Sequence, residues 1–214
     1  MRHAVLTLGL AAGLAAPATA QWVGVPVWNS PEGGGLVVSA DYAKPNTAFG
    51  GGSTWGVRFS WGRGTLTFTA GATSWQPGAA GESLTSIGGN AALRLNGGAP
   101  LVSASPGFRA NLQLGFAHSE VANVVVSPIS GTSVTGAVGF GARLAAPNIT
   151  VEPYFSPGLR YRGVAGGANS TEFGYAIGAN VGFGRFGVHL AYDNEQLQGG
   201  GNVGVIGVGA HVAP

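Results

Sequence analysis

The alternation of apolar and polar residues is the sequence feature that most restricts how this chain can fold. The stretch FRANLQLGF, residues 108–116, places Phe108, Leu112 and Phe116 on one parity and Arg109 and Gln113 on the other. A period of two predicts a β-strand with two unlike faces. Periodicity alone leaves two arrangements open, because a soluble sandwich turns its apolar face inward whereas a membrane barrel turns it outward to lipid.

Charge content and glycine placement favour the membrane barrel. A soluble domain typically has about a quarter of its residues charged, whereas only 8% of this chain is charged. Glycines alternate with apolar residues in several strands, as Gly139 and Gly141 do on either side of Phe140. Glycine weakens a strand, but in a narrow barrel it leaves room for large polar side chains. We therefore expect the glycine face to line the lumen.

The first twenty residues predict export. MRHAVLTLGLAAGLAAPATA has basic residues, then a short apolar run, then small residues in A-x-A spacing. This pattern is typical of a secretory signal peptide cleaved after Ala20. The run is too short to cross a bilayer as a helix. We assign residues 1–20 to the signal peptide, 21–34 to an N-terminal periplasmic segment and 35–214 to the barrel domain.

Alternating runs predict ten strands, and an eight-stranded barrel stays open as the alternative. The runs lie near residues 35–43, 53–62, 64–74, 84–96, 107–118, 133–144, 149–162, 171–184, 186–194 and 202–213. Long loops alternate with tight turns, except at 96–107; outer-membrane barrels place long loops outside and short turns in the periplasm. The predicted fold is therefore an all-β, closed, antiparallel up-and-down transmembrane β-barrel.

Over essentially all of the mature sequence, this pattern resembles the small outer-membrane β-barrel proteins of Gram-negative bacteria. The last strand in that family alternates apolar residues and ends in an aromatic residue. Here Ile206, Val208, Ala210 and Val212 alternate, but the chain ends HVAP. The resemblance implies an outer-membrane location, contact with outer-membrane lipid, and periplasmic chaperones and the barrel-assembly machinery as partners.

Aromatic residues on the lipid parity fall near the two ends of the predicted strands, which is typical of interfacial anchoring. The loop-side group is Tyr42, Trp55, Phe116, Tyr161, Phe173 and Tyr192, and the turn-side group is Trp61, Phe108, Phe183 and Phe186.

Charged residues gather on the inward parity, where they must be paired and hydrogen-bonded. The set is Arg58, Arg94, Arg109, Arg143, Glu152, Arg160, Glu172, Asp41 and Asp193. Arg94, Arg109, Arg143 and Glu152 lie toward the turns, and Asp41, Arg160, Glu172 and Asp193 toward the loops. The network is either a polar core that plugs the barrel or, if water fills the lumen, a narrow passive pore that prefers anions.

One tight turn predicts how its two flanking strands pair. The turn AAPN, residues 145–148, is expected to place Leu144 opposite Ile149 and Glu152 diagonally from Arg143.

The loop SEVANVVVSPISGT, residues 119–132, is rich in valine. It either extends a hairpin above the membrane or forms an apolar surface for a ligand or partner.

The function expected from these residues is a structural or binding role, or the narrow anion-preferring pore. An outer-membrane hydrolase and a secreted soluble β-barrel are the alternatives. Catalysis needs a nucleophile or activated water within reach of a base, whereas His189 and Asp193 on one strand are about 13 Å apart, with Asp41 able to approach from the closing strand. We assign no catalytic residue, no metal site, no cofactor and no nucleic-acid partner, and the residues identify no ligand.

Overall fold

The computed structural model describes residues 22–27, 35–78, 82–95, 107–121, 130–165, 169–197 and 200–213. Its strands are β1 (Gly35–Pro45), β2 (Ser53–Arg63), β3 (Leu66–Gln76), β4 (Leu84–Arg94), β5 (Gly107–Val121), β6 (Ser130–Ala146), β7 (Ile149–Val164), β8 (Ser170–Phe183), β9 (Phe186–Gln196) and β10 (Asn202–Val212). A short 3₁₀ helix, η1 (Thr47–Phe49), follows β1.

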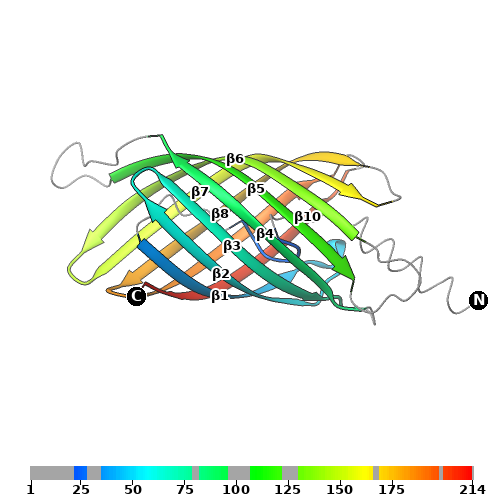
Figure 1. Ribbon diagram of the computed structural model, residues 1–214, viewed down its shortest axis with the longest axis horizontal. Helices are drawn as coiled ribbons and strands as arrows, with labels where there is room; N and C mark the ends of the chain where they lie inside the picture. The colour runs from blue at the N-terminus through cyan, green and yellow to red at the C-terminus, as the bar shows by residue number, and fades with distance from the viewer. Residues whose placement is uncertain are drawn as a thin grey trace, which may run out of the picture.

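Each strand pairs antiparallel with its neighbours in sequence, and β1 pairs with β10 to close the barrel (Figure 1). The prediction of ten strands is confirmed, and the eight-stranded alternative is wrong. Closure matters energetically because it leaves no row of unpaired backbone groups at a sheet edge. Among the described residues, no helix is long and apolar enough to cross a membrane.

The apolar face of the strands is the outside of the barrel. In β5 the side chains of Leu112 and Leu114 are 49% and 63% exposed, whereas Asn111 and Gln113 are only 2% and 3% exposed. The same division holds in β2, where Trp55 and Phe59 are exposed and Arg58 is buried. The stretch FRANLQLGF therefore turns its leucines and phenylalanines outward and its polar side chains into the lumen.

The two ends of the barrel differ in their connections. Two-residue turns at 64–65, 147–148 and 184–185 lie at one end, which we call the turn-side end, and the connections after β1, β3, β5, β7 and β9 lie at the loop-side end. Gly64 and Gly184 have φ of 64° and 62°. A positive φ at the first turn residue is what a type II′ hairpin turn requires of glycine.

The register between β6 and β7 differs from the expected one. Leu144 pairs with Val151 and Ala146 with Ile149, so the turn consists of Pro147 and Asn148 alone. Ala145 and Ala146 continue the ladder up to Pro147, which has no backbone N–H to contribute, and Asn148 tolerates its φ of 65°. The printed pairs on either side, Gly141 with Tyr154 and Leu144 with Val151, place Arg143 across from Glu152 and not diagonally from it.

Several strands are longer than expected at the loop-side end. β5 continues to Val121 and β6 begins at Ser130, so residues 119–121 and 130–132 extend the hairpin, and residues 122–129 lie outside the described residues. Val121 is 6% exposed and faces the barrel interior. β9 continues to Gln196, which adds Glu195 to the inward face. Residues 96–106, the exception to the loop pattern, are also not described.

Residues 22–27 lie inside the barrel, which corrects the expectation that residues 21–34 form a periplasmic segment; residues 21 and 28–34 are not described. Trp22 is 2% exposed and Val25 is fully buried. Both belong to a cluster, here called the loop-side apolar cluster, made of Trp22, Val23, Val25, Ala43, Phe49, Trp75, Leu84, Ala117, Val121, Val203 and Val205. The sequence does not predict this position, because a six-residue segment can be buried in the lumen only when a closed barrel surrounds it.

Candidate functional site

The lumen contains two networks of charged side chains and, toward the turns, a cavity. The loop-side charge cluster consists of Arg160 and Arg162 from β7, Asp193 and Glu195 from β9, and Glu172 from β8. The central cluster consists of Asp41, Arg58, His189 and His211. Side chains of both clusters point inward because they occupy the parity opposite the lipid-facing residues.

The carboxylates of the loop-side charge cluster are buried. Asp193 and Glu195 are both fully buried. Arg160 donates to both carboxylate oxygens of Asp193, with Nη2 at 3.0 Å from Oδ2. Arg160 Nη1 also lies 3.5 Å from Glu195 Oε2, and Arg162 forms an ion pair with Glu195. Two guanidinium groups from β7 thus hold two buried carboxylates from β9, with β8 between the two strands. Buried charges require such pairing.

Glu172 lies directly across from Arg160 in the pairing of β7 with β8 and is also buried. Glu195 was not among the residues expected in the lumen, because the predicted strand ended at residue 194. Continuing the inward parity of His189 and Asp193 by one more alternation would have found it.

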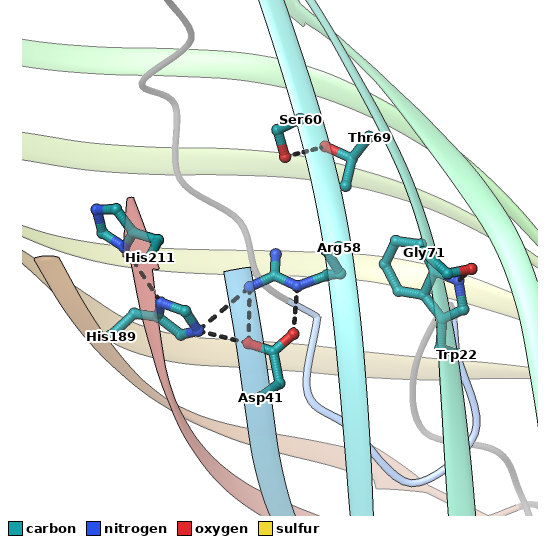
Figure 2. A network of polar contacts seen from close by, with 8 residues as sticks. All are labelled: Trp22, Asp41, Arg58, Ser60, Thr69, Gly71, His189 and His211. Atoms are coloured by element: carbon teal, nitrogen blue, oxygen red, sulfur yellow. Dashed lines mark hydrogen bonds and ion pairs between the residues drawn. The ribbon is translucent and has the colours of Figure 1, made fainter. Parts of the chain in front are cut away.

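The central cluster joins both sides of the barrel closure (Figure 2). Arg58 of β2 donates from Nε to Asp41 Oδ2 at 2.6 Å and from Nη2 to Oδ1 at 3.0 Å, a bidentate pair with β1. His189 Nε2 lies 2.7 Å from Asp41 Oδ1 and 3.2 Å from Arg58 Nη2. His189 Nδ1 lies 3.4 Å from Nδ1 of His211. Asp41, not Asp193, is therefore the carboxylate beside His189.

Glycines opposite these side chains provide the space they occupy. A Cβ atom on Gly174 would meet the guanidinium of Arg160, and one on Gly187 would meet the ring of His211, each within 3.0 Å. A Cβ on Gly209 would come within 3.0 Å of His189, Asp41 and the backbone oxygen of Ala40. The expectation that lumen glycines make room for large polar side chains is confirmed at these positions.

Replacing Gly209 with alanine is expected to lower the free energy of unfolding by about 1–3 kcal/mol, the usual cost of overpacking. The added methyl group must displace the side chain of His189 or Asp41. It also meets the backbone oxygen of Ala40, which cannot shift without moving the strand. Gly136→Ala is the matched control, because a Cβ there meets nothing within 4 Å. Denaturant unfolding in lipid vesicles measures both variants, and equal stabilities would show that the lumen is not packed as described.

Toward the turns the charges are more open to solvent. Glu152 is 2% exposed and its Oε2 lies 4.0 Å from Nη1 of Arg109, while Arg94 is half-buried and Arg143 is exposed. A cavity of about 290 Å³ opens beside them. Its lining includes Arg58, Arg143, Glu152, His189 and His211, so the cavity links the turn-side charges to the central cluster.

Aromatic side chains expected in the two belts lie on the outer face. All of them are exposed except Tyr42, which is half-buried with its ring centroid 4.6 Å from that of Trp55. The exposed ones are Trp55, Trp61, Phe108, Phe116, Tyr161, Phe173, Phe183, Phe186 and Tyr192. Trp75, in contrast, is buried in the loop-side apolar cluster and donates from Nε1 to the carbonyl of Gly51 at 2.9 Å.

A closed barrel with large hydrophobic side chains over its outer face and a charged interior requires an apolar environment such as a lipid bilayer around it. The protein is an outer-membrane β-barrel. The described residues of this barrel hold no group of three or more side chains that could bind a metal ion.

No family model matches the chain, and no curated protein matches it. Solved structures with a similar architecture are Gram-negative outer-membrane barrels. The N-terminal β-barrel domain of Pseudomonas aeruginosa OprF is 13% identical with a TM-score of 0.39, covering 84% of this chain and 99% of that one. The outer membrane enzyme PagL is 14% identical with a TM-score of 0.43, covering 83% and 99%. Neisserial surface protein A is 19% identical with a TM-score of 0.41, covering 86% and 100%. At these identities, what the barrels share is architecture.

Proposed function

We propose that this protein is a closed outer-membrane barrel with a binding or structural role, and that residues 22–27 seal its lumen at the loop-side end. The observation that supports the proposal is the burial of this segment among inward side chains, directly beside the loop-side charge cluster. An open passive pore would need a continuous water-filled path past both.

The segment contacts strands on separate sides of the lumen. Trp22 Nε1 donates to the carbonyl of Gly71 in β3 at 3.0 Å, and the Thr73 hydroxyl donates to the carbonyl of Val23 at 3.1 Å. The backbone N–H of Val27 donates to Asp193 Oδ2 in β9 at 3.0 Å. Because β3 and β9 are separated around the barrel by β2, β1 and β10, the segment bridges the interior.

Gly24 shows how closely the segment fits. Its φ is +76°, a conformation that side-chain-bearing residues rarely adopt, and a Cβ there would lie within 3.0 Å of the Thr54 side chain. Thr54 itself is fully buried in β2. The apolar side chains of Val23 and Val25 on either side of Gly24 complete the contact with the loop-side apolar cluster.

Planar-bilayer recording tests the seal. The wild-type barrel is expected to give no steady conductance, whereas a variant lacking residues 22–27 is expected to open a narrow, anion-preferring channel because arginines line the remaining lumen. Gly136→Ala, which changes only the outer face, is the control and is expected to be as silent as the wild type. A conducting wild type, or a silent deletion variant that inserts normally, would contradict the proposal that this segment closes the barrel.

We infer that residues 1–20, which lie outside the described residues, are removed as a signal peptide. The mature chain would then begin at residue 21, next to the buried Trp22. We also propose that periplasmic chaperones and the barrel-assembly machinery are its partners in biogenesis. We propose no catalytic role for Asp41 and His189, because Arg58 and His189 together serve as hydrogen-bond partners of the buried Asp41 carboxylate.

A further inference from the structure

We propose that the turn-side cavity is a binding site for a small phosphate-bearing anion that enters from the periplasmic end of the barrel. The cavity of about 290 Å³ is lined by three arginines, Arg58, Arg143 and Arg185, by His189 and His211, and by a single carboxylate, Glu152. Ligand pockets span about 300–1,000 Å³, so this one is at the small end and suits a compact ligand.

The balance of charge in the cavity favours an anion. Asp41 engages Arg58 through two hydrogen bonds, which leaves Arg143 and Arg185 as the positive charges opposed only by Glu152 among the lining residues. Glu152 Oε2 also lies 4.0 Å from Nη1 of Arg109, a further arginine, in β5. One carboxylate thus serves several guanidinium groups, and an anionic ligand would complete the balance.

The donors around the cavity suit phosphate because a phosphate group accepts hydrogen bonds on three or four oxygens at once. Guanidinium groups bind phosphate through paired N–H donors. The hydroxyls of Ser39, Thr67 and Thr150 also line the cavity. The amide nitrogen of Asn180, on the same lining, is buried and has no hydrogen-bond partner in the described part of the chain. A buried donor of this kind is costly unless a ligand or water accepts from it.

The cavity lies where a periplasmic ligand can reach it. Its lining includes Gly184 and Arg185, which form the turn between β8 and β9, and Ala213, which follows β10. Short turns of outer-membrane barrels face the periplasm. At the loop-side end the lumen is closed by residues 22–27, as proposed above. The phosphate group could therefore belong to a soluble periplasmic molecule or to a phospholipid headgroup of the inner leaflet.

Binding of inorganic phosphate to the full barrel in a neutral, phosphate-free detergent, followed by isothermal titration calorimetry, tests the site. Arg185→Gln is expected to weaken binding by about tenfold or more, the effect of losing one charge-assisted interaction. Arg185 lies in an exposed turn, so the barrel should fold normally without it. Glu152→Gln is expected to strengthen binding, because it removes the only carboxylate from the lining.

Arg63→Gln is the matched control, because Arg63 ends β2 at the same end of the barrel but does not line the cavity. It should leave phosphate affinity unchanged. Absence of phosphate binding would overturn the proposal. An equal loss of affinity in Arg185→Gln and Arg63→Gln would also overturn it, since the binding would then depend on general surface charge and not on the cavity. Repeating the titration in nanodiscs with and without phosphatidylglycerol identifies the source: competition by the lipid assigns the site to a headgroup, and undiminished binding assigns it to a soluble phosphate.

Because the measurement reports phosphate binding and not conductance, it is independent of the seal. A conducting wild-type barrel that binds phosphate would contradict the proposed function and leave this inference intact.

Discussion

Asp193→Ala is expected to lower the free energy of unfolding by about 3–5 kcal/mol, the typical cost of removing one member of a buried ion pair. The carboxylate is fully buried and accepts hydrogen bonds from Arg160 and from the backbone N–H of Val27. Without it, Arg160 and Arg162 remain in the interior with less compensating charge, and the backbone N–H of Val27 loses its acceptor in β9. Equilibrium unfolding by denaturant in phospholipid vesicles measures the loss.

Two further variants separate charge from packing. Asp193→Asn keeps the shape and one acceptor oxygen, so it should cost less than the alanine variant. Glu120→Ala is the surface control: Glu120 forms an ion pair with His118 at 3.0 Å, but both side chains are largely exposed, and exposed pairs contribute about 0–1 kcal/mol. If Asp193→Ala were no more destabilising than Glu120→Ala, the loop-side charge cluster would not contribute to the stability of the barrel.

Leu112→Arg is expected to lower the free energy of unfolding by about 2–4 kcal/mol, because it places a charge in the hydrocarbon layer. Leu112 is 49% exposed on the outer face of β5 and lies midway along the strand between Phe108 and Phe116, which are exposed on the same face. Leu112→Phe keeps the site apolar and should be nearly neutral. The same vesicle-based unfolding measurement compares them, and equal stability of the two variants would mean that this face does not contact lipid.

Gln113, on the inward face of β5, is expected to tolerate a larger side chain less well than its parity alone predicts. From parity alone, Gln113→Arg should be better tolerated than Leu112→Arg, provided that the lumen has room. Gln113 is 3% exposed and donates from Nε2 to Asn111 Oδ1 at 2.8 Å. The lumen is filled at this depth, so a larger side chain must overpack it, at a cost of about 1–3 kcal/mol.

The sequence by itself determined which face of each strand meets lipid and where most of the strands lie, and it favoured ten strands over eight. Phe108, Leu112 and Phe116 repeat with a fixed period of two, and each alternation is a local property of consecutive residues. The low charge content and the glycines opposite the apolar residues also indicate that the apolar face is the outside of a membrane barrel. Because all of these signals are local, no knowledge of distant contacts is needed to interpret them.

Only the tertiary structure decided which inward charges meet and what fills the lumen. Asp41 and His189 are 148 residues apart in sequence, and they become neighbours because β10 pairs with both β1 and β9. A slip of register by one residue would turn each of these side chains to the other face, so parity alone cannot name its partner. The burial of Trp22 and Val25 could not be predicted from local patterns, since the interior that encloses them exists only after the strands have closed into a barrel.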